Sequence, residues 1–186
     1  MTSVEVLGIT DSLSSDNEKY AAGLKAVASA FTEALDIFNS PQFVSKEGWN
    51  KETESAAHDI VYSKYVDSGK LYALRCEMPK DCETVFKDYW DGVEKLCDWN
   101  SNLAFSKILA KLSSHVDVCH FDSFESRGDT FFEDAKFQYA NRDILIVKGR
   151  DFLITRMHRK LDKGYITVGR SFELADIPET RANVRY

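Results

Sequence analysis

Residues 149–160 read GRDFLITRMHRK, and the alternation of polar and apolar side chains in this stretch is typical of a half-buried β-strand. Side chains two positions apart lie on the same face of a strand, so Arg156 shares a face with Phe152 and Ile154. A charged side chain on an apolar face is costly unless a partner answers its charge. The stretch therefore predicts both a sheet and a partner for Arg156.

The N-terminal part of the chain predicts a flexible start followed by a helix. Residues 1–15 are mostly polar, and we expect them to be flexible. In segment 16–40 apolar side chains recur at steps of three and four, which is the period of an amphipathic helix. Ser15 followed by Glu18 forms a candidate capping box at its start. The apolar stripe consists of Tyr20, Leu24, Val27, Phe31, Leu35 and Phe38.

Strands and one more helical segment follow. Residues 80–100 predict a helical segment with a break at Gly92. The apolar runs predict three pairs of strands, which are 59–66 with 70–78, 104–114 with 117–124, and 150–161 with 165–174. This order of elements indicates an α+β chain with one curved antiparallel sheet, against which a helix packs.

Composition and charge narrow the classes of function. The net charge is −6, which argues against a nucleic acid as partner and provides no polybasic anchor for an acidic membrane. Four cysteines without a CxxC motif are typical of reduced thiols. The acidic N-terminus resembles neither a secretory signal nor a mitochondrial presequence, so we expect a soluble, cytoplasmic protein.

The sequence gives little support for an enzyme. The histidines lie at positions that match no common metal-ligand spacing. The chain contains no phosphate-binding loop, no dinucleotide-binding glycine motif and no nucleophile elbow. We therefore expect no catalytic residues, no metal and no cofactor, although the chain order of a catalytic triad is not readable from sequence.

Asp122 is a candidate partner for Arg156. Val118, His120 and Asp122 share one face of the neighbouring predicted strand, and opposite charges on adjacent strands can pair across a sheet. Such a pair is either a structural salt bridge or a polar anchor in an apolar pocket, where a few polar groups orient a mostly apolar ligand.

Three blocks of the sequence resemble the START family, the StAR-related lipid-transfer domains. They are WNSNLAFSKILAKL at 99–112, GRDFLITR at 149–156 and IPETRANVR at 177–185, and they occur in the family's order. The resemblance is closest to the cholesterol-binding, steroidogenic acute regulatory subgroup. It covers roughly 45–186 and, more loosely, the first helix.

The resemblance implies a helix-grip fold, in which a curved antiparallel sheet and a long C-terminal lid helix enclose a lipid-sized tunnel. It implies a non-enzymatic protein that binds a sterol and carries it between membranes, with transient contact at organelle membranes. In the subgroup an acid and an arginine form a charged pair inside the tunnel, and these positions match Asp122 and Arg156. Leu96 and Asn100 match residues near the cavity wall.

The START-like segment, 41–186, departs from the family pattern in two places. The sequence ends at Tyr186, before the position of the lid helix, which we therefore expect to be missing. The stretch 123–149 is longer than the usual connection. Either it forms an extra hairpin, or DILIV occupies a strand position and Lys148 replaces Arg156 as the inward cation; the spacing to the third block favours Arg156.

The alternative to a lipid carrier is a truncated START-like fragment that does not transport lipid and acts as an interaction module or is inert. A hydrolase or cyclase of the wider superfamily is less favoured, because no nucleophile motif is present. The oligomeric state is not predicted by the sequence.

Overall fold

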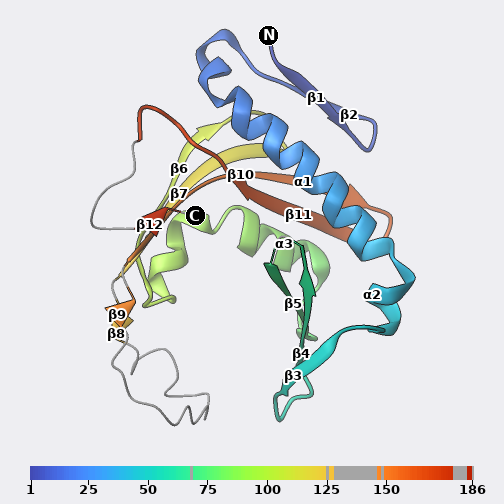
Figure 1. The fold of residues 1–186 in the computed structure, drawn as a ribbon. Coiled ribbons are helices and arrows are strands. Elements are labelled where there is room, and N and C mark those ends of the chain that lie inside the picture. Colours follow the sequence, from blue (N-terminus) through green and yellow to red (C-terminus); the bar gives the residue numbers. More distant parts are fainter. Residues whose placement is uncertain (68, 125, 128–145, 148, 178–183, 186) are drawn as a thin grey trace.

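A curved antiparallel sheet with helices on both of its faces forms the body of the protein (Figure 1). The computed structural model describes all residues except 68, 125, 128–145, 148, 178–183 and 186. The helical elements are η1 (Ser15–Tyr20), α1 (Ala21–Asn39), α2 (Pro41–Ser45), α3 (Cys82–Trp90) and η2 (Val93–Asp98). The strands are β1 (Ser3–Val6), β2 (Ile9–Ser12), β3 (Asn50–Glu54), β4 (Ile60–Val66), β5 (Gly69–Arg75), β6 (Leu103–Lys111), β7 (Val116–Ser123), β8 (Ser126–Arg127), β9 (Ile146–Val147), β10 (Arg150–Leu161), β11 (Gly164–Ser171) and β12 (Val184–Arg185).

The main sheet has the strand order β11-β10-β7-β6, and the short β12 pairs with the start of β10. The predicted pairs 104–114 with 117–124 and 150–161 with 165–174 are both confirmed as antiparallel neighbours. β7 and β10 are also antiparallel neighbours, and their register places Arg156 opposite Asp117. The sheet curves like an arch, with α1 on its outer face and α3 on its inner face (Figure 1).

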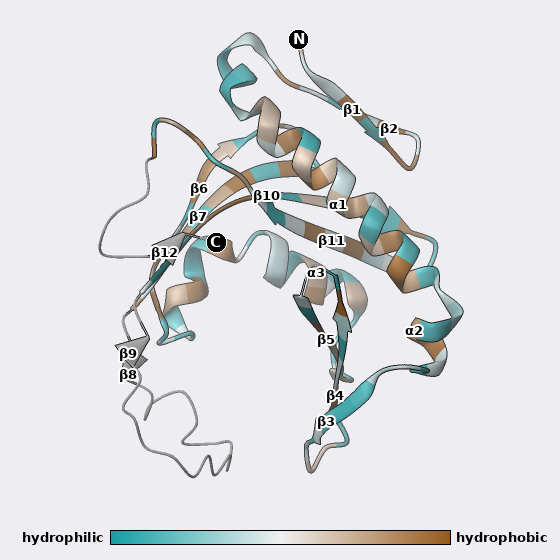
Figure 2. Ribbon diagram, viewed as in Figure 1, coloured by the Kyte–Doolittle hydropathy of each residue, from teal (hydrophilic) through white to brown (hydrophobic). Residues whose placement is uncertain are grey.

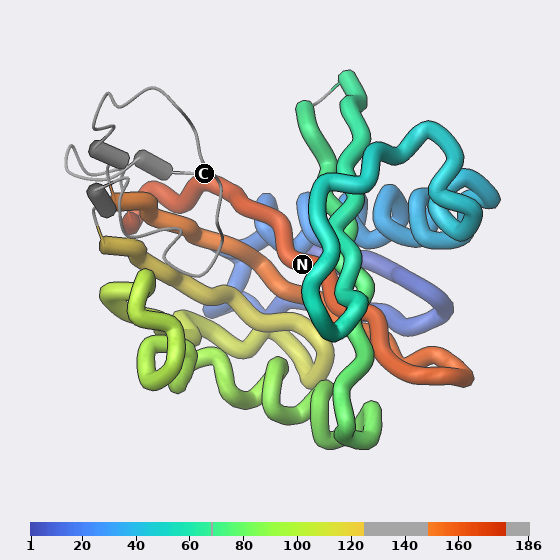
Figure 3. Tube along the Cα trace, turned by 90° about the horizontal axis from the view of Figure 1, so that it is seen from below, coloured from blue at the N-terminus to red at the C-terminus, as the bar shows by residue number. Residues whose placement is uncertain are grey.

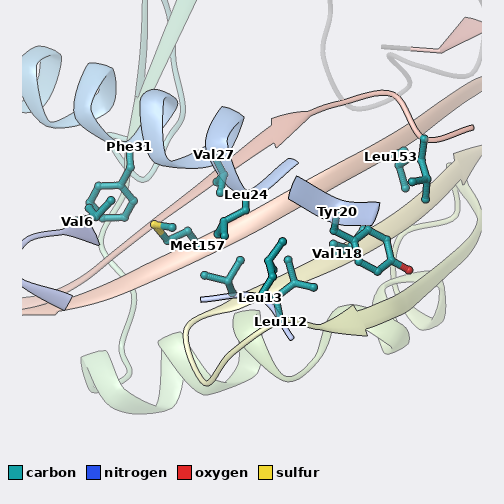
Figure 4. Packing of buried hydrophobic residues seen from close by; sticks show 12 residues of the cluster. Val6, Leu13, Tyr20, Leu24, Val27, Phe31, Leu112, Val118, Leu153 and Met157 are labelled. Atoms are coloured by element: carbon teal, nitrogen blue, oxygen red, sulfur yellow. The ribbon is translucent and has the colours of Figure 1, made fainter. Parts of the chain in front are cut away.

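The hydrophobic core lies between α1 and the outer face of the arch (Figure 4). The predicted helical stripe is confirmed in its first part, because Leu24, Val27 and Phe31 are fully buried, whereas Phe38 at its end is 56% exposed. Opposite them, Val118 and Met157 come from β7 and β10 and are also fully buried. Burial of such side chains contributes on the order of 1.5–3 kcal/mol each and fixes which sheet face points outward.

A second, three-stranded sheet of order β3-β4-β5 stands at one end of the arch (Figures 1 and 3). The predicted hairpin of 59–66 with 70–78 is confirmed as β4 and β5, which pair from Ile60 to Arg75. β3 is an edge strand that is hydrophilic throughout and exposed (Figure 2). The expectation of one sheet was wrong in this respect, because β3–β5 form a separate hydrogen-bonded unit within the described residues.

The N-terminal segment corrects two predictions. Residues 1–15 are not a flexible start: β1 and β2 form a hairpin that packs beside α1. Asp11 of this hairpin makes a buried ion pair with Arg159, at 2.6 Å from its Nη2. The capping box is also wrong, because Glu18 instead accepts hydrogen bonds from the backbone N and Oγ1 of Thr2.

The stretch 123–149 begins and ends with the short antiparallel pair β8–β9, which fits the base of an extra hairpin. The residues between them, and Lys148, lie outside the described residues. β10 begins at Arg150, so Arg156 keeps the inward position that the sequence favoured. Past β11, the described residues contain β12 and no helix.

Candidate functional site

Side chains along β10 alternate between the hydrophobic core, on the outer face of the arch, and the inner face. Leu153 and Met157 point outward to the core beneath α1. Phe152, Ile154 and Arg156 point the other way, as their spacing predicted. The inner face therefore presents half-buried apolar side chains with one arginine among them.

The partner of Arg156 is Asp117. Nε of Arg156 donates to Oδ1 of Asp117 at 2.9 Å, and Nη2 donates to Oδ2 at 2.6 Å, so the pair is bidentate. Arg156 is 2% exposed and Asp117 is 3% exposed. A buried ion pair with this geometry supplies the counter-charge that the position of Arg156 on an apolar strand face requires.

α3 covers the ion pair from the inner side. Nη2 of Arg156 also donates to the backbone oxygen of Trp90 at 3.0 Å. The ring of Trp90 lies 4.3 Å from the guanidinium carbon, and that of Tyr89 lies 5.8 Å away. Apart from an interaction of the guanidinium with the Cys119 thiol, the two N–H groups of Nη1 donate to no group in the part of the chain that the structure describes.

The predicted pairing of Asp122 with Arg156 is wrong. Asp122 lies opposite Asp151 in the register, five residues along β7 from Asp117. An odd separation places two side chains on opposite faces of a strand, so Asp122 shares the outer side with Val118 and His120. Burial, followed by the charge of Asp151, raises the pKa of the Asp122 carboxyl above its ordinary value.

Electrostatics around the pair follow from burial. Burial works against the charge of Arg156, but the hydrogen bonds and charge of Asp117 raise the arginine's pKa above its ordinary value. Cys119 lies on the same strand face as Asp117, with its Sγ 3.3 Å from Oδ1 of that residue. Burial and the negative charge of Asp117 raise the pKa of the Cys119 thiol to about 12. The thiol is therefore neutral at physiological pH.

Leu96 and Asn100 lie in and just after η2, which packs against β6. The backbone oxygen of Leu96 accepts from the backbone N of Asn100 at 2.9 Å, and Oδ1 of Asn100 accepts from the backbone N of Asn102 at 3.1 Å. These bonds shape the turn into β6. A contact of either side chain with a ligand stays a prediction.

A cavity of about 420 Å³ opens beside the ion pair, between α3, η2 and β6. Its lining includes Trp90, Glu94, Ile108, Lys111 and Asp117. Sequence reasoning missed Asp117 and Trp90. The signal for Asp117 was present, because it lies an even number of residues from Cys119 and Phe121, which face inward.

The small sheet adds a second apolar surface. Leu71 of β5 lines a cavity on the side of α1, so the neighbouring Tyr72 and Leu74 belong to the opposite face of β5, by alternation. Tyr72 is 65% exposed and Leu74 is 64% exposed. Large exposed apolar side chains on one sheet face are typical of a surface that receives an apolar ligand or partner.

Comparison with known proteins identifies the family. The sequence model of the START domain matches residues 29–185, which is most of the chain. The chain belongs to the START domain family. Its α+β architecture, with an N-terminal helix and a curved antiparallel sheet, is the fold that the resemblance implied.

Individual relatives agree with this assignment. The chain is 34% identical over 163 residues to steroidogenic acute regulatory-like protein 1 of Caenorhabditis elegans, covering 88% of this chain and 56% of that protein. It is 26% identical to the mitochondrial steroidogenic acute regulatory protein of Equus caballus, covering 95% of this chain and 54% of the relative. The START domain chain thus spans about half the length of the curated relatives it matches.

Solved structures show the same fold. The human StAR-related lipid transfer protein 5 superposes with a TM-score of 0.67 at 14% identity, over 89% of this chain and 70% of that one. Human STARD10 superposes with a TM-score of 0.57 at 19% identity, over 84% of this chain and 56% of that one. At these identities the likeness concerns the fold.

The described residues were also considered for a metal site and for a membrane-spanning helix by the composition of their side chains. They contain no group of three or more His, Cys, Asp or Glu side chains arranged to hold a metal ion. Among the helices of the described part, none has the length and apolar character needed to cross a membrane.

Proposed function

We propose that this START domain binds a lipid against the inner face of the arch, that a sterol is the favoured ligand, and that it carries the lipid between membranes without chemistry. Transfer requires transient contact with each membrane, and we place the protein in the cytoplasm and at organelle surfaces. Family membership supports lipid binding, and the names of the relatives favour a steroid-related role.

The observation that carries the proposal is the buried arginine with unused donors. The inner face supplies apolar contact, worth about 25 cal/mol for each Å² removed from water. A sterol offers one hydroxyl on a rigid apolar body, and leaving that hydroxyl unpaired costs on the order of 1–3 kcal/mol. Arg156, held in place by Asp117, can donate to it from Nη1, directly or through a water molecule.

The first test is a titration of the purified protein with a fluorescent sterol. Arg156→Leu removes the donors and should weaken sterol binding about tenfold, a loss of about 1.4 kcal/mol. Arg170→Leu, an exposed cation on the neighbouring β11, is the matched control and should bind as the wild type does.

Folding must be separated from binding in this test. Arg156→Leu leaves the Asp117 carboxylate buried without its partner, which destabilises the fold. The double variant Arg156→Leu/Asp117→Leu removes both charges and should fold well while still binding sterol weakly. Wild-type affinity in the folded double variant would contradict the role of Arg156 as the anchor.

A further inference from the structure

A second cavity lies on the outer side of the main sheet, away from the inner face. Its volume is about 760 Å³, and its walls are the C-terminal half of α1, the strand β11, the hairpin β4–β5 and the segment around α2. Small-molecule sites commonly have volumes of about 300–1,000 Å³. The cavity is therefore large enough for a ligand with a long apolar body.

The wall formed by α1 is apolar and recessed. Ala30, Ala34 and Ile37 are spaced by four and three residues, so they form one stripe along the helix and face the cavity together. Two of these three side chains are single methyl groups, which leave room between the helix and the strands. Glu33 and Asp36 line the rim of this wall and are exposed to water.

The wall formed by the strands combines apolar side chains with cations. Val168 of β11, Val66 of β4 and Leu71 of β5 supply the apolar part. The ring of Trp49 also lines the cavity. The cavity is thus bounded on two sides by groups that would gain from contact with a hydrocarbon chain.

Two cations, Arg170 and Lys64, lie on the strand wall. Nη1 of Arg170 lies 3.9 Å from Oε2 of Glu33, so this cation faces an acid. Lys64 is half-buried, and it forms no hydrogen bond or ion pair with any residue that the structure describes. A half-buried ammonium group at an apolar cavity is best satisfied by an anion.

We propose that this outer cavity binds an amphipathic carboxylate of the fatty-acid class. Its hydrocarbon chain lies along the Ala30–Ala34–Ile37 stripe, and its carboxylate pairs with Lys64. Glu33 faces Arg170, and Asp36 lies at the exposed rim, where water and salt weaken its repulsion of the ligand. The site is distinct from the sterol site proposed above, because this cavity and the cavity beside the Arg156–Asp117 pair share no lining residue.

The test is a calorimetric titration of the full chain with sodium decanoate. The wild type should bind decanoate, and Lys64→Met should weaken that binding about tenfold, equivalent to about 1.4 kcal/mol. Lys107→Met, which removes an exposed cation of β6, is the matched control and should bind as the wild type does. The neutral 1-decanol should bind the wild type and Lys64→Met equally, because it cannot use the ammonium charge.

A second pair of variants tests the location without changing charge. Ala34→Trp fills the cavity and should abolish decanoate binding, whereas Ala22→Trp, at an exposed position of the same helix, should leave it intact. Circular dichroism establishes that each variant is folded. Decanoate binding that is unchanged in Lys64→Met or in folded Ala34→Trp would overturn the proposal, and so would a wild type that binds no decanoate.

The proposals for the two sites can be tested independently of each other. The folded variant Arg156→Leu/Asp117→Leu should retain wild-type affinity for decanoate, and Lys64→Met should retain wild-type affinity for the fluorescent sterol. Loss of decanoate binding in the Arg156 variant would place the carboxylate on the inner face and would overturn the outer site.

Discussion

At the scale of the residue, alternation along the strand predicts the face on which Arg156 lies but not the residue with which it pairs. Its place beside Phe152 and Ile154 could be predicted, and so could its need for an acid. The identity of the acid could not be predicted, because it depends on the offset between two strands that are far apart in sequence. An offset of one residue moves every side chain of a strand to the other face. The sequence therefore does not decide whether the face with Asp122 or the face with Asp117 lies beside Arg156.

The first prediction at this scale concerns Asp117. Asp117→Asn leaves the buried guanidinium of Arg156 without a counter-charge and should lower the free energy of unfolding by about 3–5 kcal/mol. Urea denaturation followed by circular dichroism measures the change. Asp122→Asn leaves the partner of Arg156 in place and should cost clearly less; a larger loss in Asp122→Asn would contradict the observed pairing.

Cys119 provides a second prediction. Its thiol has a pKa of about 12 and is buried, whereas Cys76 and Cys82 are exposed. Alkylation proceeds through the thiolate, so at pH 8 iodoacetamide should modify the two exposed cysteines well before Cys119. Peptide mass spectrometry after timed quenching measures the order. Equal rates in the native protein would show that Cys119 is neither shielded nor held neutral.

At the scale of the element, the long periodic segments could be predicted and the N-terminal hairpin could not. The helix, the β4–β5 hairpin and the strands of the main sheet carry their own apolar period. β1 and β2 are four residues each, and the burial of Asp11 depends on Arg159, far away in the sequence. Strands of four residues give only a weak periodic signal, and this hairpin is held in part by a partner far away in the sequence.

The packing of α1 on the sheet leads to a prediction at Gly23. A methyl group at this position would collide with Oγ1 of Thr155 and would lie 3.0 Å from the ring of Phe172. Although alanine favours a helix, the overpacking in Gly23→Ala should cost about 1–3 kcal/mol of stability. Thermal denaturation measures the loss, and Gly23→Ala/Thr155→Ala should recover most of it. A variant Gly23→Ala as stable as the wild type would contradict the close approach of helix and strand.

At the scale of the whole molecule, the fold class could be predicted from the order of the elements, but the separation of β3–β5 from the main sheet could not. Alternation identifies strands, but it does not say which strands share hydrogen bonds across long connections. The small sheet stands at one end of the arch, beside its inner face (Figure 1). The surroundings of the candidate site therefore depend on how the two sheets are placed, which the sequence pattern alone does not predict.

Native mass spectrometry of the purified chain tests the proposed function at this scale. A monomer that carries one sterol-sized lipid is the expected result. The same measurement on Arg156→Leu/Asp117→Leu should show less bound lipid. A chain that remains empty after incubation with sterol vesicles would contradict the lipid carrier and favour an interaction module.

The ion pair between the N-terminal hairpin and β10 has a consequence for how the protein is made. Asp11 and Arg159 are separated by 148 positions, so Asp11 leaves the ribosome long before its partner is translated. At about 5–20 residues per second, the interval is roughly 7–30 s. During this time the hairpin can pack only against α1, and the Asp11 carboxylate gains its buried counter-charge only after β10 has been translated.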